Sequence, residues 1–301
     1  MEQQLTVWCV TDNKPGHLSQ LRGLVHALSR RRELAVQWVD CRDCARRRTA
    51  PGNERPDLII AAGHSTHLPA LSLKRRFGGR LVAIMKPSLP RQLFDLCIIP
   101  EHDGVRPSRR VLTTLGALND IEPSTESRED QGLILVGGSA RHYQWSDTHM
   151  IEQLRELKRA IPGQRWTLTT SRRTPASFVE SAAVLEDDHF AIVPFEQTDR
   201  EWLLGKYRDC GVIWVTEDSA SMVYEALSAG ARVGVLAVPR SGQGRVSRGL
   251  DQLCASGRVT TLEQLESLGA MPPASAPLSE AGRVAEYLDD WLRNRESRLN
   301  Q

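Results

Sequence analysis

Short apolar runs recur through the first 120 residues, and amphipathic segments lie between several of them. Runs of this length and composition are typical of strands that are buried in a parallel sheet. After the first run, leucines at positions 18, 21, 24 and 28 keep the spacing of one helix face. The predicted strands are Leu5–Val10, Leu34–Val39, Leu58–Ala62, Leu81–Met85, Leu96–Ile99 and Val111–Leu115. The alternation predicts a parallel sheet covered by helices.

A second alternation of the same kind follows a polar stretch. Residues Asn119–Gln131 contain Pro123 and several Ser, Thr, Glu and Arg residues without apolar periodicity, which indicates a linker. Beyond it, strands are predicted at Leu133–Val136, Trp166–Thr169, Ala191–Val193, Val212–Val215 and Val233–Ala237, and helices at Asp147–Ile161, Ala176–Val184 and Ser219–Ala229. The second half therefore also predicts a parallel sheet with helices.

These patterns predict an α/β protein with two Rossmann-like domains that face each other across a cleft. We expect a first domain over residues 1–120, a linker over 121–131, a second domain over 132–278 and a terminal helix over 279–301. In that helix Val284, Leu288 and Leu292 share one face, so that it is able to cross back to the first domain. Ligands of such folds bind at the carboxyl ends of the strands.

Composition and charge exclude several classes of protein. With 301 residues and 40% hydrophobic content the chain can bury two cores, which excludes wholesale disorder. The formal net charge is only +2, so we expect no nucleic-acid partner. Residues 1–128 carry 20 basic and 13 acidic side chains, whereas residues 129–301 carry 19 and 24. The first domain is therefore basic and the second acidic.

No apolar run approaches the roughly 20 residues that span a bilayer, and the start of the chain lacks the pattern of a signal peptide. We therefore expect a cytoplasmic protein, with peripheral attachment to a membrane left open. Six cysteines are scattered along the chain, and the Cys41-x-x-Cys44 pair has no second pair to complete a zinc set. Reduced thiols and no bound metal are expected.

Polar residues gather where the strands of the first domain end. The first turn contains Asp12, Lys14, Gly16 and His17, the third strand leads into His64, Ser65 and His67, and the next two strands end at Lys86 and at Glu101 with His102. Carboxyl ends of parallel strands meet at one sheet edge, so that these residues are expected to form the wall of an active cleft. Each of these residues could also have a structural role; Asp12, for example, is a suitable helix cap.

Residues Gly63-His64-Ser65-Thr66-His67 nearly match the G-x-S-x-G nucleophile elbow. His67 stands where that motif has its second glycine, which argues against a serine hydrolase. We favour hydrogen bonding and proton transfer by these side chains.

The strand ends of the second domain carry residues suited to phosphate. Candidates for binding a donor are Gly138, Ser139 and Arg141 after one strand, Ser171, Arg172 and Arg173 after the next, Phe195, and the segment Glu217, Asp218, Ser219, Ser221 and Met222 with Glu225. Glycines let a backbone approach a diphosphate, and helix N-termini favour negative charge. Capping of the helix by Ser219 or Ser221 is the structural alternative.

Several motifs are missing from the sequence. It has no P-loop, no H-E-x-x-H and no G-x-G-x-x-G after a strand, which argues against P-loop NTPases, zincins and ordinary dehydrogenases. The absence of a Tyr followed four residues later by a Lys counts against ordinary epimerases as well. No D-x-D occurs, which argues against metal-dependent sugar transfer.

Basic runs lie in the first half of the chain, at Arg30–Arg32, Arg46–Arg48, Lys74–Arg76 and Arg106 with Arg109–Arg110. Such runs are usually solvated faces. The third lies beside Leu71, Leu73 and Phe77, a combination that fits an anionic membrane surface.

Taken together, the strand-end motifs resemble the elongated-mitochondria (mitochondrial fission factor) family, whose bacterial members are of unclear activity. The resemblance runs from Val7 to Ala237. The segments that carry it are Asp12–His17, Gly63–His67, Lys86–Ser88, Gly137–Ser139, Thr170–Pro175 and Glu217–Met222.

More distantly, the chain is similar to two-domain glycosyltransferases of the GT-B type, such as the transferase that adds N-acetylglucosamine to a lipid-linked peptidoglycan precursor. That resemblance implies that Gly16 and His17 face an acceptor and that Gly138, Ser139, Glu217 and Glu225 hold a donor nucleotide. The repeated glycines that follow the first strand of that transferase are missing here.

The resemblance implies a metal-independent glycosyltransferase that takes a sugar from a nucleotide-sugar, its co-substrate, to a lipid-linked or cell-envelope saccharide. His17, or Asp12 through it, would be the general base, and no other cofactor is expected. The rival interpretation is a non-catalytic, membrane-associated adaptor that retains the fold.

Overall fold

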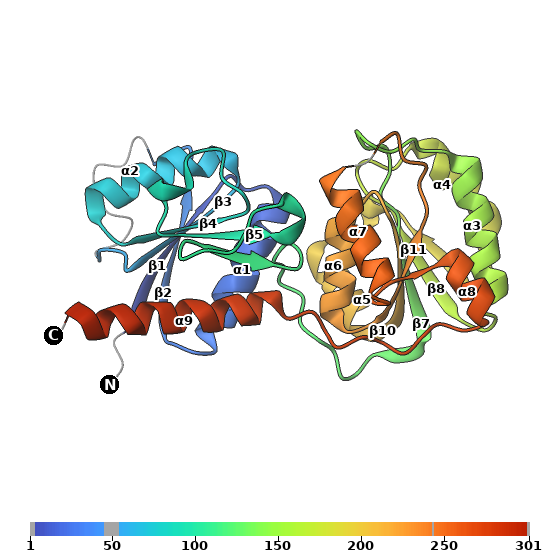
Figure 1. Ribbon diagram of the computed structural model, residues 1–301. Coiled ribbons are helices and arrows are strands. Elements are labelled where there is room, and N and C mark those ends of the chain that lie inside the picture. Colours follow the sequence, from blue (N-terminus) through green and yellow to red (C-terminus); the bar gives the residue numbers. More distant parts are fainter. Residues whose placement is uncertain (1–3, 45–53, 243, 300–301) are drawn as a thin grey trace. The chain divides into compact units, whose positions relative to one another are not determined.

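The computed structural model describes residues 4–44, 54–242 and 244–299. The chain forms two compact units, one of Met1–Asp120 with Ser279–Gln301 and the other of Ile121–Leu278 (Figure 1). Each unit holds a six-stranded sheet in which every pair of neighbouring strands is parallel. The predicted fold class, two Rossmann-like domains, is confirmed.

The first sheet has the strand order β2-β1-β3-β4-β5-β6. Its strands are β1 (Leu5–Thr11), β2 (Leu34–Asp40), β3 (Leu58–Ala62), β4 (Arg80–Ile84), β5 (Leu96–Pro100) and β6 (Val111–Thr114), and its helices are α1 (Pro15–Ser29), α2 (His67–Phe77) and α9 (Glu280–Leu299). Side chains of β1, β3 and β5 are buried on both faces of the sheet, which explains why these strands are continuous apolar runs.

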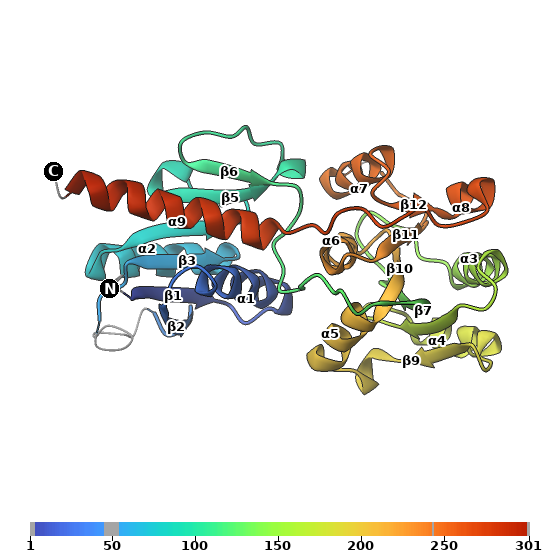
Figure 2. The same cartoon turned by 90° about the horizontal axis from the view of Figure 1, so that it is seen from below.

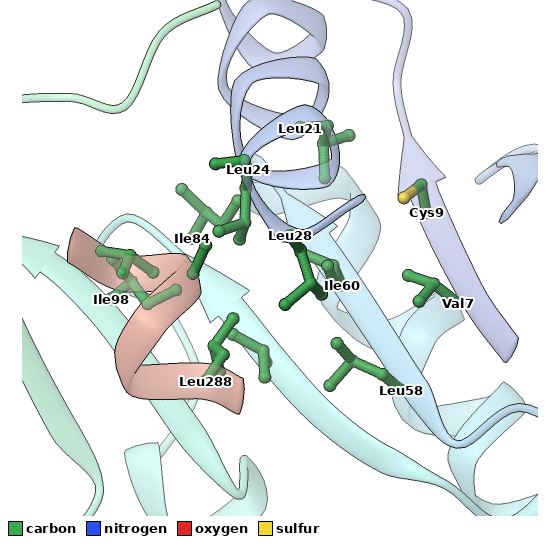
Figure 3. Packing of buried hydrophobic residues seen from close by; sticks show 14 of the residues in the cluster. Val7, Cys9, Leu21, Leu24, Leu28, Leu58, Ile60, Ile84, Ile98 and Leu288 are labelled. Carbon is green, nitrogen blue, oxygen red and sulfur yellow. The ribbon is translucent and has the colours of Figure 1, made fainter. Parts of the chain in front are cut away.

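Helices α1 and α9 cover one face of this sheet, and α2 covers the other (Figure 2). Figure 3 shows how Leu24 and Leu28 of α1 and Leu288 of α9 pack with Leu58 and Ile60 of β3. A single apolar cluster therefore joins the beginning and the end of the chain.

Polar contacts also fix α9 to the first unit. Arg32 Nε forms an ion pair with Asp289 Oδ1 at 2.7 Å, and Glu280 Oε2 accepts a hydrogen bond from the Leu115 N–H at 3.0 Å. The Arg80 guanidinium lies over the Trp291 ring, 5.0 Å from its centre. The terminal helix therefore crosses back to the first unit, as its apolar face allowed.

Among the connections of this sheet that are described throughout, two lack an α-helix. Between β4 and β5 and between β5 and β6 the described chain forms only short 3-10 turns, η2 (Arg91–Leu93) and η3 (Glu101–Asp103). Phe94 is fully buried in the cluster beneath α2, and Leu89 and Val105 pack against that cluster. These loops therefore cover the area of the sheet that helices usually cover in such folds.

The second sheet has the strand order β12-β11-β10-β7-β8-β9. Its strands are β7 (Arg128–Leu135), β8 (Arg165–Thr169), β9 (Phe190–Val193), β10 (Cys210–Thr216), β11 (Arg232–Leu236) and β12 (Thr260–Thr261). Its helices are α3 (Asp147–Ala160), α4 (Ala176–Ala182), α5 (Arg200–Asp209), α6 (Ala220–Ala229), α7 (Arg245–Ala255) and α8 (Leu262–Leu268), with short 3-10 turns η4 (Ala183–Leu185) and η5 (Phe195–Gln197).

Part of the predicted linker belongs to this sheet. Strand β7 begins at Arg128, so that Arg128–Gln131 is a strand and not a linker. Arg128 is paired with Cys210 of β10, and Gln131 with Arg165 of β8. The side chains of residues 128–130 are exposed, so that this part of the strand has no apolar pattern in the sequence. Backbone pairing with the neighbouring strands decides the structure here.

The structure differs from the sequence prediction at the end of β4 as well. The strand ends at Ile84, and Met85 takes a backbone φ of 73°, a conformation that is uncommon for a residue other than glycine.

In the part of the chain that is described, no helix is both long and apolar enough to cross a bilayer.

Candidate functional site

The turn between β1 and α1 positions the first group of predicted residues. Asn13 adopts φ 60°, and its N–H donates to Thr11 Oγ1 at 3.0 Å. The Lys14 N–H donates to Asp12 Oδ1 at 3.3 Å, and Pro15 begins the helix, where its missing N–H has no cost. The tight turn places His17, in the first turn of α1, beside Asp12.

The Asp12 carboxylate is the centre of a hydrogen-bond set. His17 Nδ1 lies 2.7 Å from Asp12 Oδ1, while Ser65 Oγ donates to Oδ2 at 2.9 Å and Lys14 Nζ lies 3.3 Å from Oδ2. Only 7% of the Asp12 side chain is exposed. Burial alone would raise the pKa of Asp12, but the hydrogen bonds from His17, Ser65 and Lys14 outweigh it and hold that pKa well below its usual range.

This geometry selects one tautomer of the neutral His17 ring. An ionised carboxylate can only accept, so that Nδ1 of the neutral imidazole carries the proton and Nε2 keeps its lone pair. The His17 side chain is 18% exposed. The pair of residues can therefore accept a proton at Nε2 while Asp12 stabilises the resulting imidazolium.

The backbone at Gly63 approaches the same imidazole closely. Gly63 has φ 97°, and a Cβ at this position would lie 2.4 Å from His17 Cε1 and Nδ1. A side chain here would displace the ring of His17. The sequence analysis did not identify Gly63 as a site residue, although its place at the end of β3 was a signal.

Ser65 does not form the arrangement of a serine hydrolase. Its hydroxyl donates to Asp12 and not to a histidine, and the lowered pKa of Asp12 makes that carboxylate a weak base for removing the hydroxyl proton. This agrees with the preference for hydrogen bonding over nucleophilic attack.

His67 lies in the core of the first unit. It is 2% exposed, its ring is 5.4 Å from that of Phe94 and 5.7 Å from that of the exposed His64, and neither of its nitrogens has a hydrogen-bond partner among the described residues. Burial, with the neighbouring His64 and His17, lowers the pKa of His67 to about 4. His67 is therefore neutral at pH 7 and does not join the Asp12 set.

Replacing His67 by leucine is expected to remove a pH-dependent loss of stability. Between pH 6.5 and pH 4 His67 binds a proton in the unfolded chain but not in the folded one. The wild type therefore loses stability as the pH falls through this range. The free energy of unfolding of His67→Leu relative to wild type should rise by about 2 kcal/mol from pH 8 to pH 5. Urea titrations at both pH values measure it, with the exposed His189→Gln as a control that should not change.

The other predicted residues of the first unit lie around this set or further along the sheet edge. The Gly16 carbonyl accepts a hydrogen bond from Gln20 Nε2 at 3.2 Å. Lys86 is exposed after β4, and its Nζ donates to the Asp103 carbonyl at 3.4 Å. Glu101 and His102 lie in η3, after β5. The structure thus brings together Asp12, Lys14, His17 and Ser65.

Three of the four basic runs are described, and two of them form ion pairs. Arg32 pairs with Asp289, and Lys74 Nζ lies 2.6 Å from Asp95 Oδ2. Arg75 and Arg76 on α2 are exposed. The run Arg46–Arg48 lies outside the described residues.

In the second unit the Gly137–Gly138 turn is held by hydrogen bonds of its own. The N–H of Gly137 donates to Thr216 Oγ1 at 2.7 Å, and that of Gly138 to Asp218 Oδ2 at 3.1 Å. The Ser139 N–H donates to the Arg173 carbonyl at 3.2 Å. Because these donors are in use, the turn can offer a phosphate close approach of the backbone rather than free N–H groups.

Asp218 acts as a brace for this turn. Its side chain is fully buried, and its Oδ2 forms an ion pair with Arg173 Nη1 at 2.8 Å. A Cβ on Gly137 would lie 2.2 Å from Asp218 Oδ2, which explains the glycine. Ser171 Oγ donates to the Gly137 carbonyl at 2.6 Å. Arg172 and Arg141 are exposed.

Glu217 and Glu225, the two glutamates predicted to bind a donor, are both paired. Glu217 forms a two-pronged ion pair with Arg240, at 3.0 and 3.1 Å, and Arg240 also lies 2.8 Å from Asp251. The hydrogen bond to Glu217 raises the pKa of Arg240 further above its usual range. Glu225 Oε2 accepts from Tyr207 Oη at 2.9 Å.

Neither Arg240 nor Tyr207 was predicted as a site residue. Arg240 lies in the loop after β11, and Tyr207 lies on α5, so that both come from segments without a recognisable motif. Only the covariation of a family, or the structure, could have shown them.

The start of α6 keeps unused donors. Ser219 precedes the helix without a side-chain cap, and among the described residues the N–H groups of Ala220 and Ser221 have no hydrogen-bond partner. Ser221 is exposed, and Met222 is half-buried. The α6 N-terminus is therefore able to bind an anion.

Phe195, another residue predicted to bind the donor, is half-buried in η5, and its N–H donates to Thr170 Oγ1 at 3.0 Å.

Comparison with known proteins identifies the family. The model of the family described as "Mitochondrial fission ELM1" matches residues 15–292, and the chain belongs to this family. An uncharacterised protein of Rickettsia prowazekii (strain Madrid E), RP120, is 25% identical in an alignment of length 292 that covers 80% of this chain and 81% of that protein.

Solved structures identify the fold class. A protein described as a UDP-N-acetylglucosamine 2-epimerase from Listeria monocytogenes matches with a TM-score of 0.67 at 13% identity, over 98% of both chains. The glycosyltransferase of kitacinnamycin matches with a TM-score of 0.56 at 13% identity, over 96% of this chain and 100% of that one. Two other matched chains are solved with UDP or UDP-N-acetylglucosamine bound.

The fold is thus the GT-B type, which nucleotide-sugar glycosyltransferases share with epimerases of UDP-sugars. The missing Tyr–Lys pair argues against ordinary epimerases, but the fold also includes epimerases of another kind, such as the one from Listeria monocytogenes. Fold alone does not decide between the two activities.

Proposed function

We propose that this protein is a glycosyltransferase that moves a sugar from a UDP-sugar to a hydroxyl of a lipid-linked or cell-envelope saccharide. The observation that carries the proposal is the pair Asp12–His17, in which a buried carboxylate leaves His17 Nε2 able to accept a proton. A transferase needs such a base for its acceptor, and a binding module needs none.

The reaction follows from these groups. His17 Nε2 takes the proton of the acceptor hydroxyl as that oxygen bonds to the anomeric carbon of the sugar. The bond from the anomeric carbon to the diphosphate oxygen breaks, and the nucleoside diphosphate leaves with the bonding electrons. The imidazolium formed at His17 is stabilised by Asp12, 2.7 Å away.

The second unit would hold the donor. Partial positive charge at the N-terminus of α6, where the Ala220 and Ser221 N–H groups are unused, would stabilise the charge that develops on the leaving diphosphate. Arg172 is exposed after β8 and would add a full charge. In this proposal these groups take the place of a metal ion.

Glu225 is the candidate for the ribose. Its Oε2 is used by Tyr207, its Oε1 is 3.8 Å from Arg200 Nη1, and its side chain is 14% exposed. A carboxylate oriented by a tyrosine is a good acceptor for a sugar hydroxyl. The acceptor would belong to the basic first unit, where exposed Arg75 and Arg76 support peripheral attachment to an anionic membrane.

Calorimetric titration with UDP, GDP, CMP and ADP, with and without EDTA, tests the proposal. We expect UDP to bind with a Kd below about 1 mM in the presence of EDTA, and Glu225→Gln to weaken it about 10- to 100-fold through the loss of a charge-assisted hydrogen bond. Glu180→Gln on α4, an equal change of charge at an exposed position, should bind as the wild type does.

No binding of any nucleotide at millimolar concentration would contradict the proposal and favour the adaptor. Nuclear magnetic resonance of the protein with UDP-N-acetylglucosamine adds a second readout. Appearance of a 2-epimer in the absence of an acceptor would show an epimerase instead of a transferase.

A further inference from the structure

The first unit contains a basic hollow whose arginines have no part in the proposed reaction; of its cations, only Lys86 was also predicted to line the active cleft. It measures about 880 Å³ and lies between the two connections that lack a helix, from β4 to β5 and from β5 to β6. Five of the residues that line it carry a positive charge: Lys86, Arg91, Arg106, Arg109 and Arg110. No carboxylate is among its lining residues in the part of the chain that is described.

Two of these cations hold the hollow together. Arg110 Nη1 donates to the Gln92 carbonyl at 2.7 Å and to the Phe94 carbonyl at 3.4 Å, which ties the two loops to each other. Lys86 donates to the Asp103 carbonyl. All three bonds go to neutral carbonyl oxygens and leave the positive charge uncompensated.

The other three cations have no partner. Within residues 4–44, 54–242 and 244–299, the side chains of Arg91, Arg106 and Arg109 make no hydrogen bond or ion pair. Like charges gathered around one hollow repel each other, and an anion that entered it would relieve this repulsion. Packing of the core does not require such an arrangement, because these side chains are exposed.

The chemistry of the lining selects the anion. A guanidinium presents parallel N–H donors that match two oxygens of a phosphate, and several together suit a diphosphate. The hollow is larger than one phosphate needs, and Val105, Pro107 and Val111 give it apolar walls. Leu93, which is 45% exposed, is next to Gln92 of the lining. A phosphate that is attached to an apolar group fits these surroundings.

We propose that this hollow is a second binding site, specific for the phosphate groups of a phosphorylated ligand with an apolar portion. The site is distinct from the Asp12–His17 pair and from the residues of the second unit, so that it stands whether or not the protein transfers a sugar. Its phosphate could belong to a lipid or to a diphosphate free in solution, and the same arginines would bind either.

Calorimetric titration with inorganic pyrophosphate, at saturating UDP so that a donor site in the second unit is filled, tests the proposal. We expect the wild type to bind pyrophosphate and the double variant Arg106→Gln with Arg109→Gln to bind it at least 10-fold more weakly. Arg75→Gln with Arg76→Gln on α2 removes the same charge outside the hollow and should change the Kd less than twofold. Thermal melts of all variants show that they fold.

Sedimentation with vesicles of phosphatidylcholine, with or without phosphatidic acid, separates the two sources. Binding that requires phosphatidic acid, is competed by pyrophosphate and is lost in Arg106→Gln with Arg109→Gln identifies a lipid phosphate. Binding of pyrophosphate alone, lost in the same variant, identifies a soluble ligand. If neither probe binds, or if the variant in the hollow binds as the wild type does, the proposal is wrong.

Discussion

Replacement of His17 by alanine is expected to lower the rate of sugar transfer by about 10²- to 10⁴-fold, because the acceptor hydroxyl would lose its base. Binding of UDP should stay within twofold of the wild type, since the residues proposed to bind the donor belong to the other unit. The measurement is the initial rate of UDP release in the presence of an acceptor, with the Kd for UDP from calorimetry. A rate within threefold of the wild type would contradict the assignment of His17 as the base.

Asp12 contacts His17 directly, whereas Ser65 contacts only Asp12, so variants of these two residues should differ in their effect on the rate. Asp12→Asn keeps the size of the side chain but removes its charge, and an amide can donate to Nδ1 and reverse the tautomer of His17. We expect a loss of more than tenfold in rate. Ser65→Ala removes only one of the hydrogen bonds to Asp12 and should cost a few-fold. If Ser65→Ala were the more damaging of the two, the pair would not act as described.

Gly23→Ala is expected to destabilise the first unit by about 2–4 kcal/mol. Gly23 lies in the middle of α1, where a Cβ would be 1.9 Å from the Asn119 carbonyl oxygen and 2.4 Å from its carbon. Both neighbours are backbone atoms, so that no side chain can rotate out of the way. Ser19, one turn earlier, donates to Asp120 Oδ1 at 2.6 Å and holds the same segment against the helix.

The matched control is Gly16→Ala on the same helix, where a Cβ meets nothing within 4 Å. Helix propensity alone should make that variant as stable as the wild type or slightly more stable. Differential scanning calorimetry measures both variants and shows whether the two units unfold separately. A Gly23→Ala protein that melts with the wild type would mean that the segment at Asn119 is free to move away from α1.

The fold could be predicted from the sequence because the strands are buried. Runs such as Leu58–Ala62 have no polar residue and are too short for a buried helix, which favours a strand inside a sheet. Helix α5 was missed because it is short and its apolar residues Trp202, Leu203 and Leu204 are consecutive, so that they show no clear period; only Tyr207 of this helix is buried. The beginning of β7 was missed for a similar reason.

The candidate site was predictable only where its residues are close in sequence. Asp12 and His17 belong to one turn, so that the pattern of the turn predicted both. The approach of Gly63 to His17, the pairing of Glu217 with Arg240 and that of Glu225 with Tyr207 join distant segments. Such contacts depend on the tertiary structure, which no local pattern records.

The return of α9 to the first unit has a consequence for the order in which a nascent chain can fold. The second unit is one continuous segment, Ile121–Leu278, and has all its strands once that segment has left the ribosome. The first unit does not, since Val284, Leu288 and Leu292 complete its core. Until the last helix emerges, the apolar face of the first sheet stays partly uncovered, and it is the part of the newborn protein most in need of a chaperone.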